Sequence, residues 1–228
     1  MRGDGVTQGQ LAEVAESLGI PTPVSGYCGH EVVIVGDLDE GALRRSLCRP
    51  TIACLEWKDG PGAVAAPLAE LERSDGIYLS LTTGSAFAVQ PAQAFRQAVE
   101  TRYDLAEETS EAVEIALNEG IANAVIHGNL DMGGVPRQTA DQMDSFCSVL
   151  NERLADPIRG RRRVHVWVMP APTKLTFRIE DEGAGYRPAP ASSDPARTSG
   201  RGLVLIRSLA RRTWLEREGR RLAMEFRR

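Results

Sequence analysis

The sequence predicts an α/β fold, in the form of an α+β two-layer sandwich whose helices cover one face of a mixed sheet. Apolar and polar side chains alternate over residues 164–169 and 175–180, on either side of an Ala-Pro-Thr turn, which is typical of a β-hairpin. A long helical pattern over residues 107–127 precedes this hairpin, and a shorter helical pattern follows it. The order strand, helix, helix, strand, strand, helix, strand, strand over residues 77–228 indicates one helical layer on one sheet.

Residues 1–76 form a separate small α/β segment in this prediction. Short apolar runs alternate with helical patterns along it. The expected helices cover 8–18, 40–47 and 64–73, and the expected strands cover 32–35 and 51–57. The segment resembles the start of a response-regulator receiver but is too short to be a complete one. We therefore expect a scaffold or a docking surface and assign it no phospho-acceptor.

The elements of residues 77–228 follow from local signals. Pro91 suits the first turn of a helix, and Asp104 with Glu107 forms a capping pair for the long helix that follows. Residues 129–163 have no clear period and are expected to be an insertion that contains a helix. The expected strands cover 77–81, 164–169, 175–180, 213–218 and 221–227, and the expected helices cover 91–102, 107–127, 142–154 and 203–210.

Composition places the chain among ordinary globular proteins. The 228 residues are 42% apolar and 25% charged, which excludes disorder, collagen and coiled coil as descriptions of the whole chain. No apolar run has the length of a membrane helix or of a signal-peptide core. The four cysteines contain no C-x-x-C spacing and are read as reduced thiols. We expect a cytoplasmic protein that does not contact a membrane.

Charge is divided unevenly along the chain. Residues 1–150 hold 9 Lys and Arg against 22 Asp and Glu, a net charge of −13, whereas residues 151–228 hold 18 against 9, a net charge of +9. A basic half is compatible with nucleic-acid binding or with an acidic partner. However, the cations are almost all arginines spread over several elements, so we do not expect a nucleic-acid partner.

The first segment with chemical potential covers residues 118–128. On a helix, Glu119, Asn123 and His127 recur every four residues and therefore form one polar stripe. A carboxylate and an amide oxygen are hard ligands that suit Mg²⁺, with water and phosphate completing the shell. Taken alone, such a stripe is more often a solvated face.

Two glycine-rich segments follow. Asp181 ends a predicted strand and precedes Gly183 and Gly185, which allow the backbone to approach a planar ligand while the carboxylate accepts from an exocyclic amine. An ordinary tight turn is the alternative. Residues 200–206 begin a helix with Gly-Arg-Gly, where backbone N–H groups and the helix dipole favour phosphate. The chain contains no G-x-x-x-x-G-K-[ST] motif, which excludes a P-loop.

The three segments together resemble the N-box and the two glycine boxes of the Bergerat-fold (GHKL) superfamily. This superfamily includes gyrase, Hsp-type chaperones, histidine kinases and mismatch-repair proteins. Asn-Glu-Gly-Ile-Ala-Asn-Ala-Val-Ile-His-Gly-Asn is most similar to the N-box of bacterial anti-sigma factor serine kinases. The resemblance covers about residues 77–228, and it implies a mostly antiparallel sheet, ATP and Mg²⁺ as cofactors, and an ATP lid at 186–199.

The resemblance also implies roles for individual residues. Asn123 matches the asparagine that coordinates Mg²⁺, and Glu119 matches the acidic residue that activates the attacking hydroxyl or water. Asp181 matches the aspartate that reads adenine. The other expected nucleotide-binding residues are His127, Gly128, Gly183, Gly185, Gly200, Arg201, Gly202 and Leu203.

Three functions remain open at this point. The first is an ATP- and Mg²⁺-dependent serine/threonine protein kinase of the anti-sigma type, which acts in bacterial stress or transcription regulation by partner switching. Its partners would be a sigma factor or an anti-sigma antagonist, and the resemblance is compatible with a homodimer. The second is a non-catalytic ATP-binding switch for a phosphatase or another regulator, and the third is the catalytic fragment of a histidine kinase. Gly120 departs from the usual alanine of the N-box. The insertion at 129–163 is longer than in minimal anti-sigma kinases, so it leaves the identity of the partner and the kinase activity open.

Overall fold

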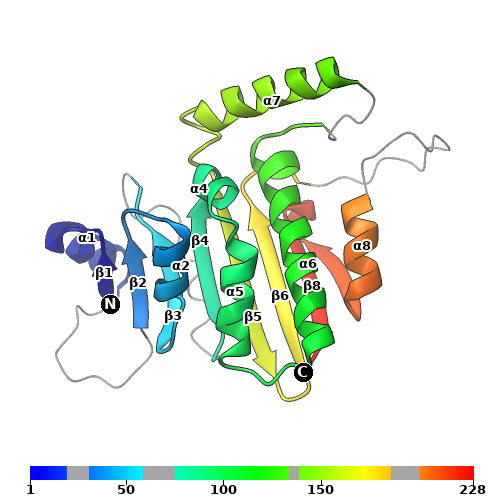
Figure 1. Ribbon diagram of the computed structural model, residues 1–228. Helices are drawn as coiled ribbons and strands as arrows, with labels where there is room; N and C mark the ends of the chain where they lie inside the picture. The colour runs from blue at the N-terminus through cyan, green and yellow to red at the C-terminus, as the bar shows by residue number, and fades with distance from the viewer. Residues whose placement is uncertain (20–30, 59–74, 134–138, 186–200) are drawn as a thin grey trace.

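The computed structural model describes residues 1–19, 31–58, 75–133, 139–185 and 201–228. These residues form one eight-stranded sheet with the strand order β1-β2-β3-β4-β5-β6-β8-β7 (Figure 1). Strands β1 to β4 pair in parallel and the remaining four pairings are antiparallel. The strands are β1 (Arg2–Asp4), β2 (Glu31–Val35), β3 (Thr51–Glu56), β4 (Ile77–Thr82), β5 (Arg163–Ala171), β6 (Lys174–Asp181), β7 (Arg212–Glu216) and β8 (Arg221–Arg227).

Most of the described helices cover one face of this sheet. Figure 1 shows α2, α5, α6 and α8 in front of the strands and α7 above the upper end of the sheet. None of the helices in the described ranges is long and apolar enough to cross a membrane. The helices are α1 (Gln8–Leu18), α2 (Glu40–Ser46), α4 (Thr83–Ala88), α5 (Pro91–Glu100), α6 (Glu107–Asn123), the π-helix η1 (Ala124–Asn129), α7 (Ala140–Ala155), α8 (Arg201–Leu209) and the 3-10 helix η2 (Arg217–Gly219).

Strand alternation divides the apolar side chains between two cores. In β2, Val33 and Val35 belong to the large core under the helical layer, whereas Val32 and Ile34 point to the opposite face. Helix α1 covers that opposite face at the N-terminal end of the sheet, where Val14 packs in the smaller core. The predicted fold, a mixed sheet with a helical layer, is confirmed.

Helix α6 carries the residues of the first motif on its outer side. Its core side is formed by Val113, Leu117 and Ile121, which recur every four residues and are buried. Because this face is held against the sheet, Glu119 and Asn123 face away from the core toward α8. The packing of α6 therefore fixes where the polar stripe lies.

The expected boundaries agree with the structure for most elements, with two corrections. Ala106 is the N-cap of α6 and makes no side-chain hydrogen bond to the helix, so the predicted capping pair of Asp104 and Glu107 is wrong. The helix expected to run to His127 as an α-helix ends at Asn123 and continues as a π-helix to Asn129. The helix expected at 64–73 and the lid expected at 186–199 lie outside the described residues.

The sheet and the core continue across residue 76. Strand β3 pairs in parallel with β4, with Ala53 opposite Tyr78. Leu43 of α2 is buried in the same large core as Val99 of α5 and Leu117 of α6. The strands of residues 1–76 thus extend the sheet that carries the motifs.

Candidate functional site

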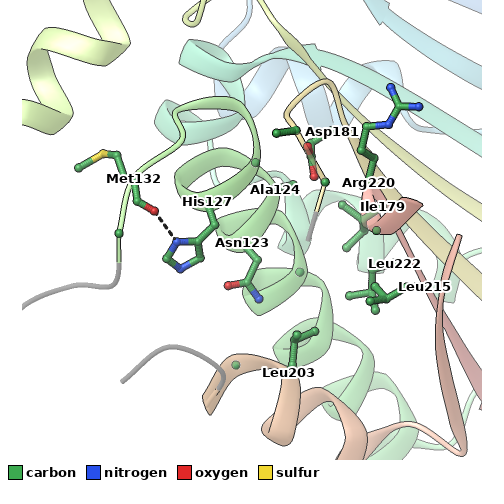
Figure 2. A pocket seen from close by; sticks show the side chains of 17 residues that line it. Asn123, Ala124, His127, Met132, Ile179, Asp181, Leu203, Leu215, Arg220 and Leu222 are labelled. Atoms are coloured by element: carbon green, nitrogen blue, oxygen red, sulfur yellow. Dashed lines mark hydrogen bonds between the residues drawn. The ribbon is translucent and has the colours of Figure 1, made fainter. Parts of the chain in front are cut away.

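A cavity of about 710 Å³ lies between the end of α6, the end of β6, the start of α8 and the turn that joins β7 to β8. Figure 2 shows Asn123 and His127 on one side of it and Asp181 and Arg220 on another. Seven of the residues expected to bind nucleotide line the cavity: Asn123, His127, Gly128, Asp181, Gly185, Gly202 and Leu203.

The remaining expected residues lie next to this lining or outside the described chain. Glu119 lies beside Gly202, and Gly183 lies beside Asp181 and Gly128. Arg201 is the exposed first residue of α8. Gly200 lies outside the described residues.

The π-helix at the end of α6 shapes one wall of the cavity. Its six residues, Ala124–Asn129, widen the last turn, and such π segments occur often at functional sites. The Nδ1 atom of His127 donates to the carbonyl oxygen of Met132 at 2.8 Å, because that carbonyl can only accept. This bond ties the segment after the π-helix to the imidazole ring at the cavity.

Asp181 is packed between two glycines at the end of β6. A Cβ atom at Gly128 would lie 2.3 Å from Cγ of Asp181, and a Cβ atom at Gly183 would lie 2.3 Å from the carbonyl oxygen of Gly128. The backbone N–H of Gly183 donates to Oδ1 of Asp181 at 2.8 Å. Only residues without a side chain permit this close approach, and it fixes the carboxylate at the cavity wall.

The surroundings of Asp181 change its acidity. Burial raises the pKa of this carboxyl from 3.8 to about 6, against the lowering effects of the Gly183 hydrogen bond and of the positive charges of Arg220 and Arg162. The carboxyl is therefore mostly ionised at pH 7 and accepts hydrogen bonds there. Its position suits recognition of an exocyclic amine.

Apolar side chains from four elements form the rest of this end of the cavity. They are Ile179 of β6, Leu203 of α8, Leu215 of β7 and Leu222 of β8. A flat ring fits between apolar walls while one carboxylate fixes its orientation, which is the usual design of a small-molecule site. Gly120 of α6 lies against Ile179, and a Cβ atom added at Gly120 would lie 2.4 Å from Cδ1 of Ile179. The glycine thus permits close packing of α6 against β6.

The start of α8 covers the polar stripe of α6. A Cβ atom at Gly202 would lie 2.5 Å from Oε2 of Glu119 and 3.1 Å from Nδ2 of Asn123. Backbone N–H groups at a helix start favour anions. Glu119 and Asn123 are therefore placed where the phosphates of a nucleotide would meet the first turn of α8.

Asn123 has an unsatisfied polar atom that fits a nucleotide with a metal ion. Its Nδ2 is buried and has no hydrogen-bond partner among the described residues, which costs roughly 1–3 kcal/mol unless a ligand accepts from it. The amide Oδ1 supplies an oxygen donor of the kind that Mg²⁺ prefers. The described residues contain no group of three or more His, Cys, Asp or Glu side chains placed to hold a metal ion. A magnesium ion would therefore take most of its ligands from phosphate and water.

Sequence reasoning missed much of the cavity wall. Leu215 and Leu222 face each other across the β7–β8 pair, and Arg220 lies in the turn between these strands. Alternation within the predicted strands 213–218 and 221–227 contains a signal for inward-facing leucines, but it does not say which helix end they meet. Met132 belongs to the insertion, where no pattern pointed to the cavity.

Comparison with known proteins agrees with this geometry. The family model of the histidine kinase-like ATPase domain matches residues 84–226, which is more than half of the chain and includes every described residue that lines the cavity. No curated protein shows significant similarity to the chain. The matched family binds ATP and has a kinase or ATPase role. The cavity lies within the matched segment, and the chain belongs to the histidine kinase-like ATPase family.

Proposed function

We propose that this protein is an ATP- and Mg²⁺-dependent serine/threonine protein kinase of the anti-sigma factor type. The observation that carries the proposal is the placement of Glu119 one helical turn before Asn123, with both side chains against Gly202 at the start of α8. Asn123 lines the cavity. A carboxylate beside the expected phosphate position is suited to accept a proton from a substrate hydroxyl.

Different residues of the site have different roles in the proposed phosphoryl transfer. Asp181 and the apolar wall orient the base, and the first turn of α8 together with Asn123 holds the triphosphate. When bound, Mg²⁺ neutralises charge on the phosphates. Glu119 accepts the proton of the attacking serine or threonine hydroxyl, while the new oxygen–phosphorus bond forms at the γ-phosphate and the bond to the β-phosphate oxygen breaks, which releases ADP.

The proposed partners follow from the resemblance of the N-box to anti-sigma serine kinases. The protein would bind a sigma factor in one state and phosphorylate an anti-sigma antagonist in another, as a cytoplasmic homodimer in bacterial stress or transcription regulation. The phospho-acceptor of a histidine kinase would lie on an accessible helix. His127 lines the cavity on the π-helix and His165 is buried against Tyr78, so neither described histidine fits that role. His30 lies outside the described residues.

The test separates nucleotide binding from phosphoryl transfer. Glu119→Gln is expected to keep ATP affinity within about threefold and to lower transfer to a serine-containing anti-sigma antagonist by about 10²-fold or more, because general bases contribute on this scale. Titration calorimetry measures the affinity, and radiolabelled γ-phosphate on the antagonist measures transfer.

Glu111→Gln is the matched control, since Glu111 is an exposed glutamate two turns earlier on α6. Normal transfer by Glu119→Gln would refute the role of Glu119. Wild-type protein that binds ATP but labels no antagonist, and whose affinity for that antagonist differs between ATP and ADP, would instead support a non-catalytic switch.

A further inference from the structure

A network of hydrogen bonds, centred on buried polar side chains, connects the cavity to the N-terminal part of the sheet. Its centre is Asn129, the last residue of the π-helix, whose side chain is fully buried. Oδ1 of Asn129 accepts from the backbone N–H of Glu182 at 2.8 Å. Nδ2 donates to Oγ1 of Thr83 at 2.9 Å and to the carbonyl oxygen of Arg163 at 3.0 Å. Since the Glu182 N–H can only donate and the Arg163 carbonyl can only accept, the partners fix the orientation of the amide.

Glu182 is held at two points, directly after Asp181. Its backbone N–H is bound by Asn129, and its carboxylate Oε2 accepts from the backbone N–H of Arg163 at 2.8 Å. These bonds fix the strand end from which the Asp181 carboxylate enters the cavity. The tolerance is small on the side of Gly128 and Gly183, where added Cβ atoms would lie 2.5 Å and 2.8 Å from Oδ1 of Asp181.

The network continues to Glu56 at the end of β3. The buried guanidinium of Arg163 donates to the carbonyl oxygen of Glu56 at 2.9 Å and to Oγ of Ser80 at 3.0 Å. The carboxylate of Glu56 is also buried and accepts from the backbone N–H of Thr82 at 2.7 Å, next to Thr83. Glu56 therefore bonds Arg163 through its backbone carbonyl and the residue before Thr83 through its carboxylate, and both Arg163 and Thr83 bond Asn129. Glu56 lies outside the segment matched by the ATPase family.

We propose that Asn129 is a positioning residue for the base-reading carboxylate of Asp181, and that Glu56 of the N-terminal segment anchors the same network. This inference rests on Asp181 accepting from the exocyclic amine of adenine. It gives the N-terminal segment a defined contribution to nucleotide recognition, made through hydrogen bonds and without contact with the ligand. A buried polar network of this kind loses its geometry when one member is left unsatisfied.

The test uses two nucleotides that differ only at the exocyclic amine. ATP carries the amine that Asp181 would read, whereas purine riboside triphosphate lacks it. Titration calorimetry of the full-length chain with each nucleotide gives a ratio of Kd values. Asn129→Asp and Glu56→Met, which removes the acceptor of the Thr82 N–H, are each expected to weaken ATP binding by about threefold to thirtyfold, the range of energetic coupling through such networks. Both variants should bind purine riboside triphosphate like the wild type, to within about twofold.

A second comparison asks whether Asn129 acts through Asp181. In an Asp181→Asn background, the further change Asn129→Asp should have almost no additional effect on ATP affinity, because the group that it positions is already altered. Glu31→Met is the matched control, since Glu31 is a partly buried glutamate of the same N-terminal segment that bonds Arg2 and lies outside the network. Thr83→Val removes one bond of Asn129 and replaces Asn129→Asp if that variant does not fold.

The outcomes are distinct. Equal weakening of both nucleotides would show that Asn129 only stabilises the fold, and unchanged affinities for both nucleotides in folded variants would show that the network does not position Asp181. Wild-type protein that binds both nucleotides equally would overturn the role of Asp181 and this inference with it. None of these results depends on phosphoryl transfer, so a failed kinase assay leaves the test of positioning intact.

Discussion

At the scale of single residues, glycines without side chains shape the candidate nucleotide site as much as the polar groups do. Gly128 brings the backbone of the π-helix against the Asp181 carboxylate, and Gly202 brings α8 against Glu119 and Asn123. Each glycine lies where a Cβ atom would displace a functional group. Substitution of these glycines is therefore expected to weaken nucleotide binding, although a glycine has no side chain that could contact the ligand.

Gly128→Ala tests this expectation at Asp181. The added Cβ would lie 2.3 Å from Cγ of Asp181, so the carboxylate must shift, and ATP affinity should fall by about tenfold or more, which is about 1.4 kcal/mol. Gly133→Ala is the control, because Gly133 also lines the cavity but a Cβ atom there would meet nothing within 4 Å. Titration with ATP measures both variants, and equal affinities would contradict the assigned packing.

The raised pKa of Asp181 predicts a pH-dependent cost to stability. The unfolded chain ionises this carboxyl near pH 3.8, whereas burial delays ionisation in the folded chain to about pH 6. Well below pH 3.8 the carboxyl is protonated in both states and does not change the free energy of unfolding. As the pH rises from 3.8 to 6, mainly the unfolded state releases the proton, so the free energy of unfolding falls. Above pH 6 this loss of stability stays constant.

Asp181→Asn should therefore raise the free energy of unfolding by about 2 kcal/mol at pH 7 and leave it unchanged near pH 3.5. The asparagine Oδ1 can still accept the Gly183 hydrogen bond, so the comparison isolates the charge. Urea unfolding across this pH range measures the effect, with exposed Asp104→Asn as the control. Parallel pH profiles for wild type and Asp181→Asn would show that burial does not disfavour the ionised carboxyl.

At the scale of helices and strands, the sequence predicted what local periodicity encodes. The alternating hairpin of β5 and β6 and the existence of the long helix α6 follow from side-chain patterns, and both are confirmed. The π-helix was missed because helical periodicity does not distinguish a π-helix from an α-helix over so few residues, and its contact between Gly128 and Asp181 joins residues far apart in the chain. Strand β1 was missed for a similar reason, since Arg2–Asp4 has no apolar pattern and is held by pairing with β2.

The predicted nucleotide site shows the same division. Motif residues such as Asn123 and Asp181 were found from residue type and spacing, and both line the cavity. The apolar wall was not found, because the opposition of Leu215 and Leu222 depends on strand pairing. The role of Asn129 was also hidden, since its three partners come from three separate parts of the chain.

At the scale of the whole molecule, the ATPase domain is one part of a larger continuous core. The family match begins at residue 84, inside α4, yet β4 lies before that residue and pairs with β3. The large core under the helices also includes side chains of β2 and α2. Because sheet and core are shared, unfolding of the N-terminal strands should remove support from the nucleotide site.

Leu43→Ala tests this coupling in the intact chain. Leu43 of α2 is fully buried in the large core, so its truncation should lower the free energy of unfolding by about 2–5 kcal/mol. Val149→Ala on exposed α7 is the control and should change it by no more than about 0.5 kcal/mol. Differential scanning calorimetry should show one transition in each protein, and saturating ATP should raise its midpoint in the wild type and in Leu43→Ala alike. Two separate transitions, with ATP shifting one and Leu43→Ala lowering only the other, would mean that the N-terminal strands fold independently of the nucleotide site.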